Sequence, residues 1–339
     1  MPNWKELIIY VHGITAEAEI NDPSKTYDDF HAGVKAVLGT GEEFGAPVKI
    51  RWGWDWDRDG KYKSEDERLA EAEEKIYGEV KKSLDKTRGF FTGIFTASVP
   101  VFNWFHLGLP TFGVPRMIVD GFRSTMLRGV ADMFYYVSED GRNTVRNNVF
   151  NTVLKELKAL RISVDNDETY ISLTCVGHSA GTVILYDILY KIFSQVPLKD
   201  YDYIDADDKK FMETVCAWAK AGKLRLRKLY TFGSPITLLL CRSNKTLGMI
   251  GGKGAPWKKF QPEQIGIKSS AELSNPRWVN FYDHDDVISY PVEFLFDLDE
   301  KNKVIEDKFI DVSNNPLEAH GKYWENKDII KYVAQTWLG

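Results

Sequence analysis

Cysteine is scarce in this chain: its 339 residues include three, Cys175, Cys216 and Cys241. They are far apart and form no C-x-x-C motif, so we expect no disulfide framework. Cys175 lies in an apolar stretch, where a cysteine usually behaves as a small buried hydrophobic residue. Reactive groups are therefore expected among the other polar residues.

The chain also lacks an excess of positive charge. It has 44 lysines and arginines against 49 aspartates and glutamates, and the net charge of −5 argues against nucleic acid as the main partner. We find no internal repeat and no apolar signal segment at the N-terminus, so we expect a cytoplasmic protein. With 43% hydrophobic and 27% charged residues, the range 1–339 fits a single soluble globular domain that carries an insertion.

An uninterrupted apolar run of transmembrane length is missing, although residues 89–115 contain no Asp, Glu, Lys or Arg. Pro100, Pro110 and Pro115 interrupt this segment, so it does not fit a membrane-spanning helix of about 20 residues. Three interpretations stay open for the insertion 88–134: a lid over an apolar pocket, additional core, or a contact with a lipid interface or another subunit. The oligomeric state stays open as well.

Strands and helices alternate along the chain. β-rich apolar runs predict strands at 7–11, 48–52, 170–176, 224–232 and 278–282. Apolar residues at helical spacing predict helices at 28–38, 64–84, 142–160, 182–190 and 326–338. This order predicts an α/β fold with a mostly parallel central sheet, helices on both faces, and functional residues at the carboxyl ends of the strands.

The most informative motif is Gly177-His178-Ser179-Ala180-Gly181, which has the form G-x-S-x-G. An apolar strand precedes it and an apolar helix follows it, so Ser179 would lie on a tight turn at the end of the sheet. Both glycines are needed because strand and helix pass close to each other there, and a Cβ atom would clash. This context predicts a nucleophilic serine in preference to an incidental one in a glycine-rich turn.

A serine nucleophile needs a base, and the base needs an acid that fixes its tautomer. Of the six histidines, His320 lies in a loop just before the last predicted helix, where such folds deliver their base. Asp283, Asp285 and Asp286 follow the strand at 278–282. We choose Asp285 because Asp285-Asp286-Val287 fits the D-x-V pattern common at this turn, with Asp283 as the alternative.

Attack by the serine places negative charge on a carbonyl oxygen, and backbone N–H groups must already point at it. One expected donor is Ala180 N–H, at the start of the predicted helix. The other is Ile14 N–H, because His12-Gly13 directly follows the first predicted strand, and Gly13 would let the backbone approach a substrate closely. The expected site holds no metal and no cofactor.

These motifs, together with Thr231-Phe232-Gly233-Ser234-Pro235 and the His-x-x-Tyr sequence at His320, resemble the α/β-hydrolase superfamily. Within it they are most similar to serine esterases, class 3 lipases and related uncharacterised bacterial hydrolases, although Ala180 stands where many lipases have leucine. The resemblance implies hydrolysis of small-molecule carboxylic esters, with a hydrophobic acyl or aromatic group, through an acyl-serine. Thioesterase, amidase or acyltransferase chemistry, or a non-catalytic binding module, are the alternatives.

Two weaker signals follow the second predicted strand. Residues 55–60 together with Asp66 resemble a calcium-binding loop, although the last ligand position holds Asp in place of the usual Glu. A solvated acidic turn is the alternative. Trp52, Trp54 and Trp56 alternate and would share one face of a strand, either as core residues or as a stacking platform for sugar rings.

Overall fold

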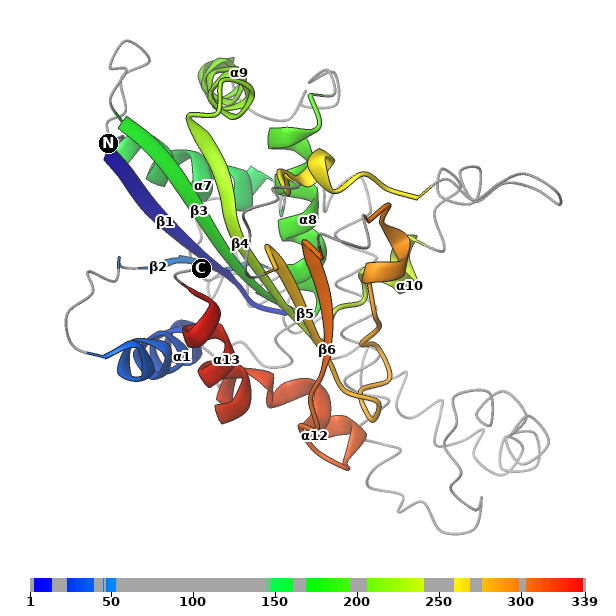
Figure 1. Ribbon diagram of the computed structural model, residues 1–339. Helices are drawn as coiled ribbons and strands as arrows, with labels where there is room; N and C mark the ends of the chain where they lie inside the picture. Colours follow the sequence, from blue (N-terminus) through cyan, green and yellow to red (C-terminus); the bar gives the residue numbers. More distant parts are fainter. Residues whose placement is uncertain are drawn as a thin grey trace, which may run out of the picture.

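The fold is an α/β arrangement in which a central parallel sheet is covered by helices on both faces (Figure 1). The computed structural model describes residues 3–13, 23–39, 45, 47–52, 145, 147–160, 169–195, 206–240, 259–268, 276–298 and 303–337. The strands of this part are β1 (Asn3–Val11), β2 (Pro47–Ile50), β3 (Thr169–His178), β4 (Leu224–Phe232), β5 (Trp278–Tyr282) and β6 (Ile305–Phe309). They form one sheet of six strands in the order β2-β1-β3-β4-β5-β6, and every described pair is parallel.

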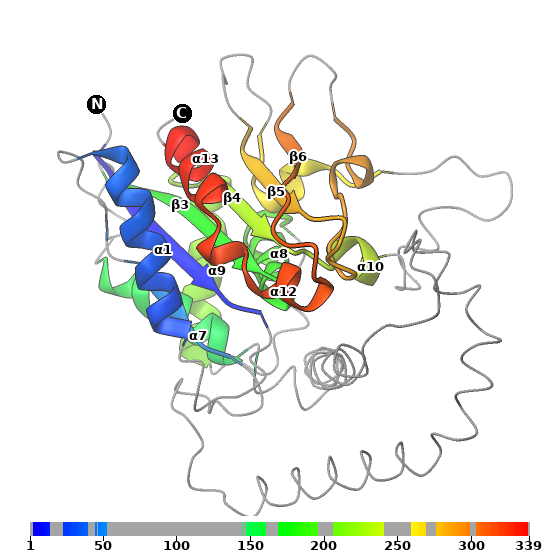
Figure 2. The ribbon, with the colours of Figure 1, turned by 90° about the horizontal axis from the view of Figure 1, so that it is seen from below.

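The helices divide into two layers. On one face lie α7 (Asn147–Ala159), α8 (Ala180–Phe193) and α9 (Ala206–Lys220), whose apolar residues form one core with that side of the strands. On the other face α1 (Pro23–Leu38) packs against α13 (Lys327–Trp337), and both contribute to a second core (Figure 2). The shorter elements are α10 (Ile236–Leu240), α12 (Pro316–Gly321) and the 3-10 helices η3 (Pro262–Ile265), η4 (Glu293–Leu295) and η5 (Tyr323–Glu325).

The carboxyl-terminal halves of β1, β3 and β4 are buried on both faces, and this burial explains why the sequence there is mostly apolar. Within β3, Leu173 and Cys175 belong to the core on the α8 side, whereas Val176 belongs to the core on the α13 side. Burial raises the pKa of the Cys175 thiol to about 12, so this cysteine is the inert small hydrophobic residue that its surroundings predicted. Trp52 is likewise a buried core residue.

Several expectations from the sequence fall outside the described residues. These are the helix at 64–84, the insertion 88–134, the loop formed by residues 55–60 with Asp66, Ile14, and the remaining two tryptophans of the alternating series. Within the described part, α9 and β6 are elements that the sequence pattern did not predict. His320 lies in α12, whereas the sequence predicted a loop, because Pro316 opens a short helical turn there.

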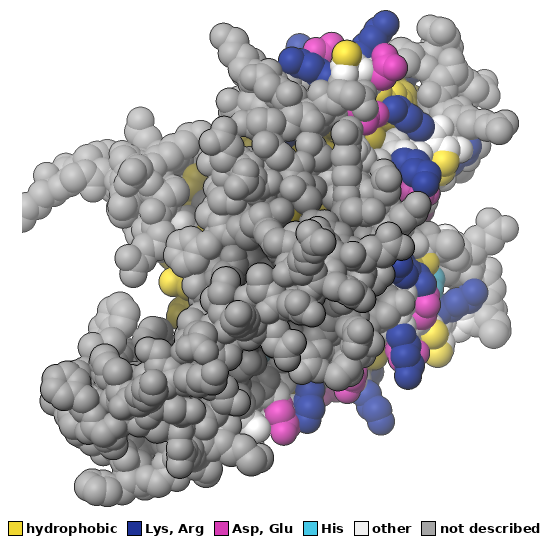
Figure 3. Space-filling model, turned by 180° about the vertical axis from the view of Figure 1, so that it is seen from behind, with side chains coloured by type: hydrophobic (Ala, Val, Ile, Leu, Met, Phe, Trp, Pro, Cys, Tyr) yellow, Lys and Arg dark blue, Asp and Glu magenta, His cyan; other side chains and the backbone are white. Residues whose placement is uncertain are grey.

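The described surface mixes charges of both signs. Seen from behind, lysine and arginine side chains alternate with aspartate and glutamate side chains along one side of the molecule (Figure 3). Among the helices that the structure describes, none is long and apolar enough to cross a membrane.

Candidate active site

Ser179 occupies the tight turn that joins β3 to α8. Its φ of 52° and ψ of −130° lie in a region of backbone conformation that residues other than glycine rarely adopt. Such strain costs on the order of 1–3 kcal/mol and persists where the surroundings enforce it. Here the Ser179 N–H donates to Phe232 O at 2.9 Å, and the Ser179 carbonyl accepts from Thr182 Oγ1 at 2.6 Å. The strand end and the first helical turn therefore hold the strained serine in place.

The glycines around Ser179 are required by close approach. A Cβ atom on Gly181 would lie 2.5 Å from Val11 O and would also clash with His12 O, because the end of β1 passes directly over the first turn of α8. A Cβ atom on Gly177 would lie 2.7 Å from Leu185 Cδ1. The expectation that both glycines of the motif avoid a clash is confirmed.

The three side chains Ser179, His320 and Asp286 form a continuous series of hydrogen bonds. His320 Nε2 lies 2.8 Å from Ser179 Oγ, and His320 Nδ1 lies 2.9 Å from Asp286 Oδ2. The serine comes from the end of β3, the aspartate from the loop after β5, and the histidine from α12. Tertiary packing thus brings together three segments that are far apart in the sequence.

The surroundings of Asp286 keep its carboxyl group ionised. Burial raises its pKa, but the positive field of His320 and hydrogen bonds from His320, Ile288 N–H and Tyr323 O–H outweigh burial, so the net pKa is lowered. A carboxylate can only accept hydrogen bonds, so His320 Nδ1 must carry the proton that points at Asp286. His320 Nε2 is then the acceptor for the Ser179 hydroxyl, which is the tautomer that a general base needs.

The structure corrects the expected acid. Asp285 is half-exposed, and its contact is a backbone one: its N–H donates to Asp283 Oδ1 at 2.9 Å. Asp283 is buried, and its other oxygen accepts from Val312 N–H at 2.7 Å, so it ties the loop after β5 to the segment after β6. The prediction that Asp285 faces His320 is therefore wrong, as is the alternative Asp283, because the turn directs Asp286 towards the histidine.

His178, which precedes Ser179 in the sequence, contacts the backbone of His320. Its Nε2–H donates to the backbone carbonyl of His320 at 2.7 Å, and the two imidazole rings lie 4.8 Å apart between centroids. Burial, together with the nearby His320, lowers the pKa of His178 to about 3. His178 is thus a neutral donor that holds the backbone of His320.

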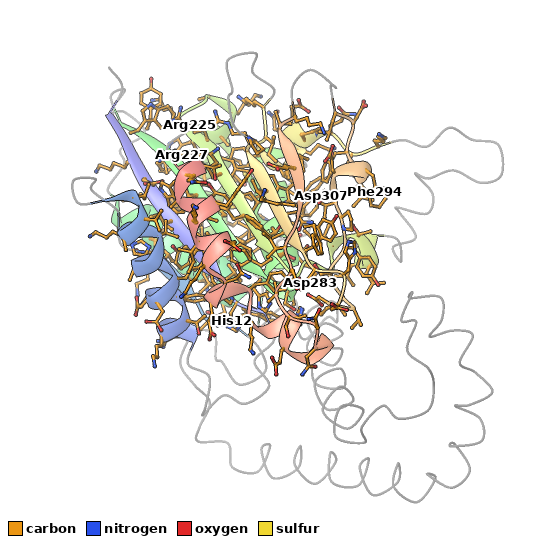
Figure 4. The ribbon with its side chains drawn as sticks, turned by 60° about the horizontal axis from the view of Figure 1, so that its bottom comes forward. His12, Arg225, Arg227, Asp283, Phe294 and Asp307 are labelled. Atoms are coloured by element: carbon orange, nitrogen blue, oxygen red, sulfur yellow. The ribbon has the colours of Figure 1, made fainter. Side chains whose placement is uncertain are left out.

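His12 and Gly13 lie at the end of β1, directly against the serine turn. The His12 Nδ1–H donates to Gly13 O, while His12 Nε2 accepts from Trp52 N–H at 3.2 Å. A Cβ atom on Gly13 would clash with Ser179 Cβ, so this backbone passes immediately beside Ser179. Figure 4 shows His12 at the same end of the strands as Asp283.

The two expected oxyanion donors have different outcomes. Ala180 is the first residue of α8, where the leading N–H groups of a helix have no partner within the helix and carry a partial positive charge. Its position therefore suits an anion at the serine. Ile14 lies outside the described residues, so its role stays a prediction.

Two residues of this site are not predicted by the sequence pattern. The sequence pattern favours Asp285 over Asp286, and it gives Tyr323 no role of its own, although the Tyr323 hydroxyl donates to Asp286 Oδ2 at 3.0 Å. The His-x-x-Tyr spacing is the signal that could have assigned Tyr323, because one residue, Lys322, separates α12 from η5, which begins at Tyr323. Gly233 adjoins them, at a φ of 56°, where a Cβ atom would lie 3.0 Å from Asp286 Oδ2.

Comparisons of the chain with protein families, with curated proteins and with solved structures find no match. The case for the site therefore rests on its geometry. Among the residues that the structure describes, no group of three or more His, Cys, Asp or Glu side chains could hold a metal ion.

Proposed function

We propose that this protein is a serine hydrolase of the α/β-hydrolase type that cleaves carboxylic esters through an acyl-serine intermediate. The observation that carries the proposal is the hydrogen-bonded series from Ser179 Oγ through His320 to Asp286, with distances of 2.8 Å and 2.9 Å. The strained serine between a parallel strand and a helix, and the strand order of the sheet, support the same assignment.

The reaction begins with proton transfer from Ser179 Oγ to His320 Nε2 as the oxygen attacks the ester carbonyl. Asp286 holds the imidazole in position and stabilises its positive charge, and Tyr323 and Ile288 N–H keep the carboxylate in place. Negative charge on the carbonyl oxygen is met by Ala180 N–H and, as we predict from the sequence, by Ile14 N–H. His320 then gives its proton to the leaving alcohol.

Water completes the cycle in the second half-reaction. His320 removes a proton from the water, hydroxide adds to the acyl carbonyl, and the carboxylic acid leaves as Ser179 recovers its proton. We propose a hydrophobic acyl or aromatic substituent in the substrate, because residues 89–115 are uncharged and rich in phenylalanine.

A series of p-nitrophenyl esters of increasing acyl length tests this proposal. We expect hydrolysis by the wild-type protein, with kcat/KM rising from acetate towards longer chains, and we expect none above background from Ser179→Ala. A wild-type protein that is folded by circular dichroism and hydrolyses none of the esters would contradict the proposal. Equal rates for all chain lengths would contradict the hydrophobic preference alone.

A further inference from the structure

Four cations gather at the end of the sheet opposite Ser179. Arg225, Arg227 and Lys228 belong to β4, and Arg277 directly precedes β5; together we call them the basic cluster. Figure 4 shows Arg225 and Arg227 at the far end of the sheet from His12. Ser172 of β3 is aligned with this cluster. It precedes Ser179 by seven positions, which is roughly 20 Å along an extended strand.

A β-bulge concentrates these cations. Arg225 pairs with Ser172 of β3, but Lys228 pairs with Thr174, so β4 carries one extra residue at this point. A bulge of this kind places two residues opposite one and redirects their side chains. Arg227 contacts Glu6 of β1, whereas the ammonium of Lys228 donates to Pro276 O at 2.9 Å.

The charges of the basic cluster are poorly balanced within the described part of the chain. Glu6 is the one carboxylate that pairs with the cluster there, at 2.9 Å from Arg227 Nη1, and it also accepts from Thr174 Oγ1 at 2.9 Å. Arg277 Nη1 donates to the carbonyl of Arg227 at 3.1 Å. The Arg225 guanidinium lies 3.7 Å from the centre of the Trp4 ring.

The same crowding is reflected in the acid–base behaviour of the cluster. Burial is the largest cause of a lowered pKa at Arg225, Arg277 and Lys228, and repulsion from neighbouring arginines is the second. The pKa of Lys228 falls to about 8. An anion between these groups would offset both the repulsion and the lost hydration.

A buried hydroxyl lies beside the cluster. Ser172 is 3% exposed, and its Oγ has no hydrogen-bond partner among the described residues. In the sheet it stands between Glu6 of β1 and Arg225 of β4, to which it is directly aligned. A buried hydroxyl without a partner destabilises the fold, so the position of Ser172 favours a bound hydrogen-bond acceptor there.

We propose that the basic cluster and Ser172 form a binding site for a phosphate group. Guanidinium groups present several N–H donors in a planar array that fits phosphate oxygens, and Ser172 would donate to another oxygen. The phosphate is either inorganic phosphate or the terminal group of a small monoester. The site is separate from Ser179 and does not depend on the proposed hydrolase activity.

Isothermal titration calorimetry on the full chain tests the proposal with sodium phosphate, glycerol phosphate and sodium chloride at constant ionic strength. We expect saturable binding of the phosphates and none of chloride. Tighter binding of glycerol phosphate would indicate a monoester ligand, whereas equal or weaker binding would indicate free phosphate. A folded protein that shows no saturable binding of either would overturn the proposal.

Three variants assign the binding to these residues. The double variant Arg225→Gln/Arg277→Gln should weaken binding about 100-fold, since it removes two charge-assisted hydrogen bonds. Ser172→Ala should weaken it about fivefold and, without phosphate, should leave thermal stability unchanged or slightly higher. Lys331→Gln removes an exposed cation of α13 as a matched control and should bind like the wild type.

Two results would contradict the site. If Lys331→Gln weakens binding as much as the double variant, the phosphate responds to overall charge and not to the basic cluster. If Ser172→Ala binds as tightly as the wild type, the buried hydroxyl is not a ligand. Ser179→Ala should retain full phosphate affinity, which keeps this test independent of the hydrolase assignment.

Discussion

Asp285 and Asp286 are adjacent in the sequence, yet their carboxylates lie in different surroundings. Asp286 is buried and accepts hydrogen bonds from His320, Tyr323 and Ile288 N–H. Asp285 is half-exposed, and its backbone is bound by Asp283. The carboxylate in the buried, hydrogen-bonded position is the one that can fix the tautomer of His320.

Because of this difference, the same Asp→Asn substitution should have a large effect at Asp286 and almost none at Asp285. Asp286→Asn should lower kcat/KM for a p-nitrophenyl ester by roughly 10³–10⁴-fold, because an amide no longer stabilises the imidazolium. Asp285→Asn serves as the matched control and should leave kcat/KM nearly unchanged. A large loss for Asp285→Asn together with a mild one for Asp286→Asn would show that the acid is assigned to the wrong residue.

His178 makes the stability of the protein depend on pH. Its pKa falls from 6.5 in the unfolded chain to about 3 in the folded protein, so the unfolded state binds a proton that the folded state rejects. Stability from this group is fully present above pH 6.5 and is lost progressively as the pH falls towards 3.

His178→Gln should remove this contribution, because glutamine keeps an N–H donor for the His320 carbonyl but does not titrate. We expect the melting temperature of the variant to fall less steeply than that of the wild type below pH 6.5. His284→Gln, which changes an exposed histidine, is the control and should keep the wild-type slope. Identical slopes for wild type and His178→Gln would show that His178 is not held neutral by the fold.

At the scale of elements, the junction of β3 and α8 depends on how closely β1 passes over it. The carbonyl groups of Val11 and His12 occupy the space that a Cβ atom on Gly181 would need. The end of β1 cannot move away from Gly181 without disturbing the sheet, because β1 is paired along its length with β3. A change in packing at the turn of Ser179 would therefore also disturb the centre of the sheet.

Gly181→Ala should accordingly lower the free energy of unfolding by about 3 kcal/mol, at the upper end of the cost of overpacking a core, and should reduce esterase activity by displacing Ser179. Gly321→Ala is a matched control at the end of α12, because nothing lies within 4 Å of its Cβ position. Urea denaturation of both variants checks the prediction. Equal stability of the two variants would contradict the packing described for the junction.

The elements that the sequence predicted are those whose apolar pattern matches their burial. The carboxyl-terminal halves of β1, β3 and β4 read as apolar runs because both faces are covered there. The helix α13 shows the helical spacing of its buried residues Ile329, Val333 and Trp337. In contrast, β6 is an edge strand with the sequence IEDKF. Most of its side chains are partly exposed, so it lacks the apolar run that marks a buried strand. The buried positions of α9 (Met212, Val215, Trp218 and Ala219) do recur at helical spacing.

At the scale of the whole molecule, the candidate site exists because the sheet aligns segments that lie far apart in the chain. Ser179 and His320 could be assigned from sequence, since a glycine-flanked turn and a histidine before the last helix are local signals. The acid could not, because three aspartates share one turn and hydrogen bonds from Val312 and Tyr323 decide which of them faces His320. Long-range contacts of this kind leave no mark in a local pattern.

The most direct test of the central claim is covalent labelling of the whole protein by a fluorophosphonate, read by intact mass and peptide mapping. The phosphonyl group reacts with a serine that a base has activated, so the label reports the assembled Ser179, His320 and Asp286 together. We predict one adduct on wild-type Ser179, none on Ser179→Ala, and strongly slowed labelling of His320→Ala. A folded wild-type protein that does not react, or a Ser179→Ala variant that is labelled to the same extent, would contradict the account.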